Sequence, residues 1–217
     1  MKLEWSPEMA AKAFMDTVKS CELYQGSSVT ELISAMAAGW NAKLIVETWS
    51  HGGLLTTSIG LAVASTHTCG RHVCIVPDQD SGTEYATAME KFGMSPEVIV
   101  GDPETVVKEL ELVIDFLVVD SRRNEFSGIL KAAKFGHRGA VLVCKNVNLR
   151  VGSDFRLRSL FDDGGSRRIV RSVFLPVGNG LDIAHVAAVG PGSGEIKTRR
   201  WIKRVDRESG EEFLIRK

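Results

Sequence analysis

Apolar residues along this chain gather in short continuous runs, which alternate with segments where apolar residues recur at helical spacing. Continuous runs are typical of strands that are buried on both faces, as in a parallel sheet covered by helices. The sequence therefore predicts a doubly wound α/β sheet. The expected strands are residues 42–49, 71–77, 97–102, 115–120 and 139–146, and the expected helices between them are residues 53–68, 81–92, 103–112 and 124–135.

The two ends of the chain add helices before the sheet and strands after it. Ser6 followed by Pro7 is typical of a helix start, and it predicts a helix to about Cys21, with a second helix that stops near Gly39. In the last third we expect a helix over 153–163, two strands joined by PVGNG in a hairpin-type connection, and a small exposed hairpin around DRESGE. The predicted organisation is N-terminal helices packed on the core over 1–40, a Rossmann-like domain over 41–192, and a basic hairpin tail over 193–217.

Charge is distributed unevenly, although the net charge of the 217 residues is zero. Residues 1–149 hold 13 Lys and Arg against 18 Asp and Glu, whereas residues 150–217 hold 14 against 9. The basic C-terminal part, with Trp201 among its arginines, indicates an acidic partner or RNA. A solvated basic face, or an exposed edge strand guarded by charge, explains the same residues.

The sequence carries no sign of a membrane or secreted protein. The N-terminus MKLEWSPEMAAKAF lacks the apolar core of a secretory signal, and no stretch approaches the roughly 18 apolar residues of a membrane span. We therefore expect a cytoplasmic or nuclear protein with no membrane partner. The four cysteines lack CxxC spacing, so buried reduced thiols are expected rather than disulfides or a metal site.

Polar residues recur just past the apolar runs, at the edge where an open parallel sheet binds its ligands. The chain contains neither the P-loop lysine motif nor GxGxxG, so ATP hydrolysis and ordinary dinucleotide binding lack support. The polar residues are Glu47, the loop from Trp49 to Gly53, Asp78, Asp102, Asp120, Lys145 and Asn146.

Five segments follow one another in the order NAKLIVETWSHGGLLTTSIGLA, VIVGDPETVVKEL, DFLVVDSRRNEF, GAVLVCKNV and LPVGNGLDIAHV. This order resembles the class I S-adenosylmethionine-dependent methyltransferases, in particular the caffeoyl-CoA and catechol O-methyltransferase branch, over about residues 27–190. The resemblance implies a sheet of about seven strands in the order 3-2-1-4-5-7-6. The chain as a whole resembles a plant family of uncharacterised proteins, defined only as a domain of unknown function, and that family implies no activity.

The resemblance also implies roles for the residues at the strand ends. The family's metal site corresponds to Asp120 and Asn146. Its S-adenosylmethionine site corresponds to Glu47 at the methionine end, Gly53 with Gly52 beside it in the loop, Asp78 or Pro77 at the ribose, and Asp102 at the adenine.

Two residues depart from the family pattern. Trp49 stands where the loop normally has a glycine, so its indole either stacks on adenosine as a platform or fills an empty cofactor cavity. Lys145 replaces the second metal-binding aspartate, and a lysine beside Asp120 would repel a divalent cation, so no metal site is expected. Lys145 then either forms a salt bridge with Asp120 or replaces the charge of the metal and acts on a substrate hydroxyl.

For other residues of these loops, the sequence also leaves a ligand-binding or catalytic role and a purely structural role open. His51 is either a base or an ordinary solvated side chain, and Gly52 and Gly53 either admit a ligand or serve only a tight turn. Arg122 and Arg123 either bind an anionic group of the substrate or cap the start of a solvated helix.

These patterns favour an S-adenosylmethionine-binding, methyltransferase-like protein that acts as a metal-independent O-methyltransferase of a small hydroxylated or anionic acceptor. Asp120, Lys145 and Asn146 are its catalytic candidates. The alternative is a non-catalytic protein of the same fold that acts as a binding module for RNA or an acidic partner. Both hypotheses are compatible with a homodimer.

Overall fold

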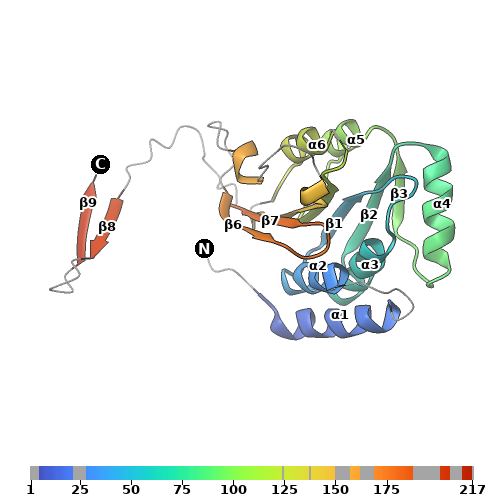
Figure 1. Cartoon of the computed structure of the whole chain (residues 1–217), viewed down its shortest axis with the longest axis horizontal. Coiled ribbons are helices and arrows are strands. Elements are labelled where there is room, and N and C mark those ends of the chain that lie inside the picture. The colour runs from blue at the N-terminus through green and yellow to red at the C-terminus, as the bar shows by residue number, and fades with distance from the viewer. Residues whose placement is uncertain are drawn as a thin grey trace.

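The protein is described by a computed structural model of the 217-residue chain (Figure 1). The fold consists of one large mixed sheet covered by helices, followed by a separate two-stranded sheet. The residues that the structure describes are 5–21, 28–123, 125–136, 138–149, 157–161, 169–187, 201–205 and 212–216.

The large sheet has the strand order β3-β2-β1-β4-β5-β7-β6, which confirms the order implied by the resemblance. The first five strands run parallel, whereas β7 pairs antiparallel with both β5 and β6, as the hairpin-type connection predicted. The strands are β1 Leu44–Thr48, β2 Arg71–Val76, β3 Glu97–Val100, β4 Phe116–Asp120, β5 Ala140–Lys145, β6 Ile169–Leu175 and β7 Leu181–Val186.

Helices cover both faces of the sheet, which explains why its central strands are continuous apolar runs. One face packs α2 and α3 against alternate residues of the central strands such as Ile45 and Val118, and the other face packs α5 and α6 against Val46 and Leu117. The helices are α1 Pro7–Ser20, α2 Ser28–Gly39, α3 Thr56–Thr68, α4 Gln79–Glu90, α5 Pro103–Glu109 and α6 Phe126–Ala132.

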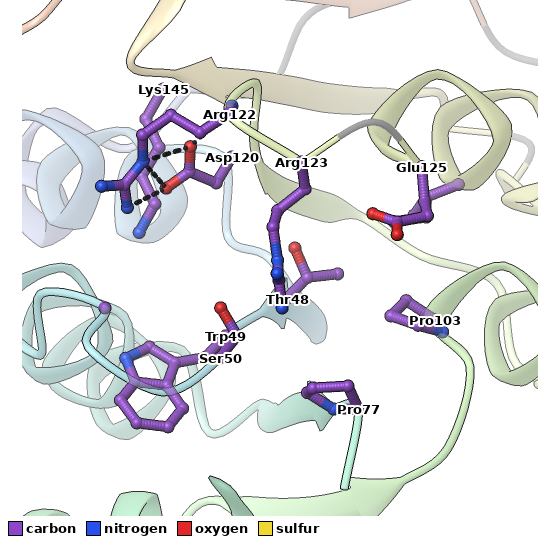
Figure 2. Close-up of a pocket in the computed structure, with 12 residues that line it drawn as sticks. Thr48, Trp49, Ser50, Pro77, Pro103, Asp120, Arg122, Arg123, Glu125 and Lys145 are labelled. Atoms are coloured by element: carbon purple, nitrogen blue, oxygen red, sulfur yellow. Dashed lines mark hydrogen bonds and ion pairs between the residues drawn. The ribbon is translucent and has the colours of Figure 1, made fainter. Parts of the chain in front are cut away.

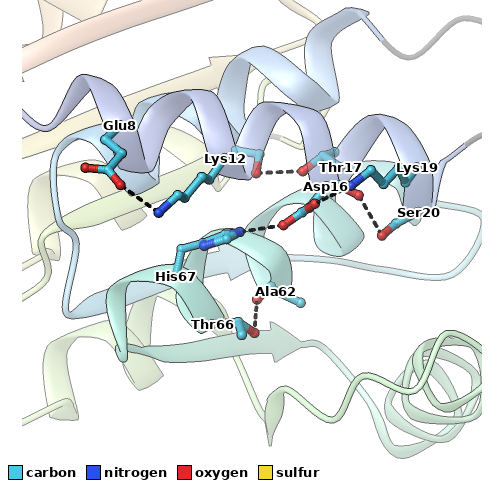
Figure 3. A network of polar contacts seen from close by, with 10 residues as sticks. Glu8, Lys12, Asp16, Thr17, Lys19, Ser20, Ala62, Thr66 and His67 are labelled. Carbon is cyan, nitrogen blue, oxygen red and sulfur yellow. Dashed lines mark hydrogen bonds and ion pairs between the residues drawn. The ribbon is translucent and has the colours of Figure 1, made fainter.

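The N-terminal helix α1 is tied to the core by polar contacts (Figure 3). Ser6 accepts a hydrogen bond from the backbone N–H of Met9, which confirms the predicted helix start. The Thr17 hydroxyl donates to the Ser34 hydroxyl of α2 at 2.8 Å in a buried contact, and Asp16 pairs with His67 of α3 at 3.0 Å. These contacts hold α1 against α2 and α3, whereas α2 itself packs on the sheet.

Two segments of the last third differ from the expectation or lie partly outside the described residues. Within the expected helix over 153–163, the structure describes a short 3₁₀ turn, Leu157–Leu160. In the tail, β8 Trp201–Val205 pairs antiparallel with β9 Glu212–Arg216, which confirms the hairpin pairing, while the DRESGE turn lies outside the described residues. No helix in the described part of the chain has the length and apolar character needed to cross a membrane.

Candidate functional site

A small cleft opens at the carboxyl ends of β1, β4 and β5, the edge where open parallel sheets bind ligands (Figure 2). The strand ends contribute Thr48, Asp120 and Lys145. The cleft has a volume of about 60 Å³. Pockets for drug-sized ligands usually measure about 300–1,000 Å³. The loops after the strands add Trp49, Gly53, Pro77, Pro103, Arg122 and Arg123 to the lining.

Asp120 is the most heavily bonded carboxylate of the cleft. Nε and a terminal nitrogen of Arg122 approach its two oxygens at 2.7–3.1 Å, and the backbone N–H of Arg122 donates to Oδ1 at 3.0 Å. Asn146 Nδ2 donates to Oδ2 at 2.8 Å. Burial raises the pKa of Asp120, but the hydrogen bonds from Arg122 and Asn146 outweigh it, so the pKa of this carboxyl lies below its usual value.

The structure brings together the three residues that the sequence proposed as catalytic, with one correction. Asp120 and Lys145 are register partners on adjacent strands, and Asn146 is bonded to Asp120. Of the two roles weighed for Lys145, the salt bridge with Asp120 is absent among the described residues, where Arg122 pairs with the carboxylate. Arg122 lies two residues after Asp120 in the same turn. Its planar guanidinium can donate to both carboxylate oxygens at once, which the single ammonium of Lys145 cannot do in the same geometry.

The indole of Trp49 is buried in the loop that follows β1. Its exposed fraction is 5%, and its ring centroid lies 5.4 Å from that of Tyr85. A Cβ atom on Gly53 would lie 2.6 Å from Trp49 Nε1 and 2.9 Å from the carbonyl oxygen of Ser50. Gly52 has φ +73°, a left-handed conformation that favours glycine. Gly52 therefore serves the turn, and Gly53 leaves room for the indole.

Glu47 lies in the interior and is not among the residues that line the cleft. Its exposed fraction is 0%, and its Oε1 accepts a hydrogen bond from the Tyr85 hydroxyl at 2.8 Å and lies 3.0 Å from His72 Nε2. Burial raises the pKa of Glu47, but the hydrogen bond and charge of His72, together with the charge of Lys145, leave the pKa below its usual value. Glu47 is thus a buried carboxylate held by two side chains of the protein.

Asp78 and Asp102 do not line the cleft, and both cap helices. Asp78 accepts a hydrogen bond from the backbone N–H of Ser81 at 2.7 Å and begins α4. Asp102 accepts one from the backbone N–H of Thr105 at 2.9 Å and begins α5. These hydrogen bonds hold the pKa of each carboxyl below its usual value. Pro77, the alternative to Asp78, does line the cleft.

Sequence reasoning missed the partners of Glu47 and placed His51 among the candidates. His51 is exposed and forms an ion pair with Glu84, in keeping with an ordinary solvated side chain. His72 on β2 and Tyr85 on α4 reach Glu47 from 25 and 38 residues away. No local motif marks these two residues, and only the pairing of β1 with β2 and the packing of α4 bring them to Glu47.

The residues of this site do not fit S-adenosylmethionine in the conformation described. The loop space that a glycine would leave for the cofactor is filled by Trp49, and Glu47 is bonded to His72 and Tyr85. The two carboxylates expected at the ribose and the adenine are helix caps outside the cleft. Within the described part of the chain, no group of three or more His, Cys, Asp or Glu residues is placed to hold a metal ion.

Comparison with solved structures supports the fold. The chain is similar to the S-adenosylhomocysteine-bound methyltransferase PaMTH1 of Podospora anserina, with a TM-score of 0.58, 15% identity, and coverage of 85% of this chain and 89% of that one. It is also similar to the O-methyltransferase TomG of Streptomyces achromogenes in complex with S-adenosylmethionine (TM-score 0.56, 20% identity, coverage 82% and 90%). A third similar structure is a putative caffeoyl-CoA O-methyltransferase of Staphylococcus aureus (TM-score 0.55, 14% identity, coverage 79% and 91%).

These likenesses establish the class I methyltransferase fold, a Rossmann-like doubly wound sheet that ends in an antiparallel pair. No curated protein matches the sequence. The plant origin suggested by the sequence stays a prediction. One family model matches residues 1–217, so the chain belongs to the family described as "Protein of unknown function (DUF1442)".

Proposed function

We propose that this protein is a methyltransferase-fold binding protein in which Trp49 fills the cofactor position and methyl transfer has been lost. The observation that carries the proposal is the placement of the indole, which packs on Tyr85 and takes the space beside Gly53. A ligand in this position would have to displace a side chain that is 5% exposed. What stays open is the small cleft beside it, at the ends of β1, β4 and β5.

The state of Glu47 supports the same proposal. In the resembling family this carboxylate holds the cofactor, whereas here it accepts from Tyr85 and contacts His72 in the interior. Buried carboxylates are stable only when such partners satisfy them. Both partners meet Oε1, and Glu47 therefore acts as a structural residue at the end of β1.

A second candidate function is a metal-independent, S-adenosylmethionine-dependent O-methyltransferase in which Trp49 moves aside. Two buried atoms favour it, because Glu47 Oε2 and Trp49 Nε1 have no hydrogen-bond partner among the described residues. Leaving such atoms unpaired costs about 1–3 kcal/mol each. A cofactor that displaced the indole and met these atoms would recover part of that cost. Two structures with this fold hold S-adenosylhomocysteine or S-adenosylmethionine.

Calorimetric titration with S-adenosylmethionine and S-adenosylhomocysteine separates the two candidates. We expect no binding by the wild type and measurable binding by Trp49→Gly, in which the loop regains its glycine. Truncating a buried tryptophan costs about 3–5 kcal/mol, so Trp49→Leu serves as a milder variant. Trp40 is equally buried, lies in another core cluster and also has an unpaired Nε1, so Trp40→Gly and Trp40→Leu are matched controls.

The wild-type titration decides the outcome. Binding by the wild type that weakens in Trp49→Leu would overturn the first proposal and make Trp49 a stacking platform, at a cost of about 1–3 kcal/mol on the scale of base stacking. No binding by the wild type, with a gain in either Trp49 variant and none in the Trp40 controls, would show that the indole alone closes the site.

A further inference from the structure

The cleft contains two cationic side chains that form no ion pair with a carboxylate among the described residues. Arg123 and Lys145 both line it, and neither forms an ion pair among the residues that the structure describes. Arg122, by contrast, pairs with Asp120, and the side-chain amide of Asn146 donates a further hydrogen bond to the same carboxylate. The negative charge of Asp120 is therefore already satisfied within the protein.

The two free cations approach the opening from different elements. Arg123 follows β4 in the turn after Asp120, and in Figure 2 its side chain extends across the opening toward Thr48. Lys145 ends β5 and is half-buried, and its charge helps to lower the pKa of both Asp120 and Glu47. Lys145 therefore supplies positive charge to the inner side of the cleft, while Arg123 supplies it at the mouth.

The remaining walls limit what can enter. Trp49, Pro77, Pro103 and Ile129 are apolar, and Glu125 carries the remaining negative charge of the lining. A volume of about 60 Å³ admits one small polar group rather than a whole nucleoside. A guanidinium and an ammonium that both line such a space are suited to an oxyanion, since both donate charge-assisted hydrogen bonds.

We propose that Arg123 and Lys145 bind the phosphate or carboxylate group of a small molecule in this cleft. The ligand presents that one anionic group to the strand ends, and the rest of it stays at the mouth beside Pro77 and Pro103. The inference deepens the proposed binding function and rests on it, because it takes the cleft as the open part of a site that Trp49 otherwise fills.

The test is a thermal-shift and calorimetric titration of the full chain with inorganic phosphate, pyrophosphate and citrate, with potassium chloride at equal ionic strength as the reference. We expect a saturable stabilisation by at least one of these anions. Arg123→Gln and Lys145→Gln should each weaken it by about 10- to 100-fold, the value of one hydrogen bond between charged groups. Lys91→Gln changes an exposed lysine at the end of α4 and should leave it unchanged.

Each outcome bears on the proposal. Preference for phosphate or pyrophosphate assigns a phosphate-bearing ligand, and preference for citrate assigns a carboxylate. No saturable effect beyond that of chloride, or an effect that survives in the double variant Arg123→Gln/Lys145→Gln, would overturn the proposal. The parallel S-adenosylmethionine titration keeps the two hypotheses apart. Cofactor binding by the wild type contradicts the proposed function, whereas loss of anion binding alone contradicts only the assignment of the ligand.

Discussion

Removing the hydroxyl of Tyr85 tests whether Glu47 is a structural carboxylate. Tyr85→Phe deletes the 2.8 Å hydrogen bond to Glu47 Oε1 and changes little else, because the ring stays in the cluster with Trp49. Both side chains are fully buried, so water cannot replace the lost donor. A hydrogen bond to a charged group contributes about 1.5–3 kcal/mol. We expect the free energy of unfolding to fall by that amount.

Urea denaturation measures this loss. With a urea dependence of about 2–3 kcal/mol per molar, the midpoint should move down by about 0.5–1.5 M. Thr83→Val is a matched control, because it removes an exposed hydroxyl from the same helix α4 and should cost less than about 0.5 kcal/mol. A Tyr85→Phe effect as small as that of the control would refute the buried hydrogen bond.

A double-mutant cycle with Glu47→Gln then isolates the pair. Contacting residues of one network usually show interaction energies of about 0.5–3 kcal/mol, and additivity of Tyr85→Phe and Glu47→Gln would mean that the two side chains do not interact.

The free energy of unfolding of the wild type should also depend on pH in the acid range. Because the folded pKa of Glu47 is lowered, its contribution is fully present above the unfolded value of about 4.3 and is lost as the pH falls through the folded pKa. In Glu47→Gln, the free energy of unfolding should fall less steeply with decreasing pH than it does in the wild type.

Two further predictions concern the metal and the tail. Millimolar Mg²⁺ or Ca²⁺ should leave the melting temperature unchanged, because Asp120 is already bonded to Arg122 and Asn146 and Lys145 lies on the next strand; a saturable rise would contradict this. If the basic tail binds RNA, retention at about 50 mM salt should fall steeply as salt is added. Deleting residues 195–217 should remove it while far-UV circular dichroism stays native-like, and no retention at low salt would leave only the edge-strand interpretation.

The strands could be predicted because burial on both faces requires continuous runs of apolar residues, which are easily recognised in a sequence. The apolar runs expected over 42–49, 71–77 and 115–120 became the neighbouring strands β1, β2 and β4 of the sheet. Helix ends were less accurate, since tertiary contacts decide them. The helix expected over 124–135 ends at Ala132, because Phe135 forms a bridge with Ile114 and leaves the helical path.

The candidate site could be predicted where the order of the strands alone brings residues together. Asp120 and Asn146 follow adjacent strands, so the fold alone places them together. Asp78 and Asp102 show the opposite case. Aspartate is also a preferred helix cap, since its carboxylate accepts from a backbone N–H of the first turn, and Asp102 is followed by a proline at the first helical position. The capping role of both residues is thus visible in the sequence, and the ligand roles implied by the resemblance stay predictions.

Two substitutions relative to the resembling family act together on the charge and shape of the cleft. Trp49 closes the side where the cofactor would lie, and Lys145 brings a cation to the position of a metal-binding carboxylate. Arg122 then neutralises Asp120, so the open part of the cleft retains the charges of Lys145 and Arg123. Closing the cofactor side removes a large cationic ligand, and the new lysine makes a small anionic one favourable. Under the proposed function, the two residues together exchange a large cationic ligand for a small anionic one, and loss of anion binding in Lys145→Gln is the result that this reasoning requires.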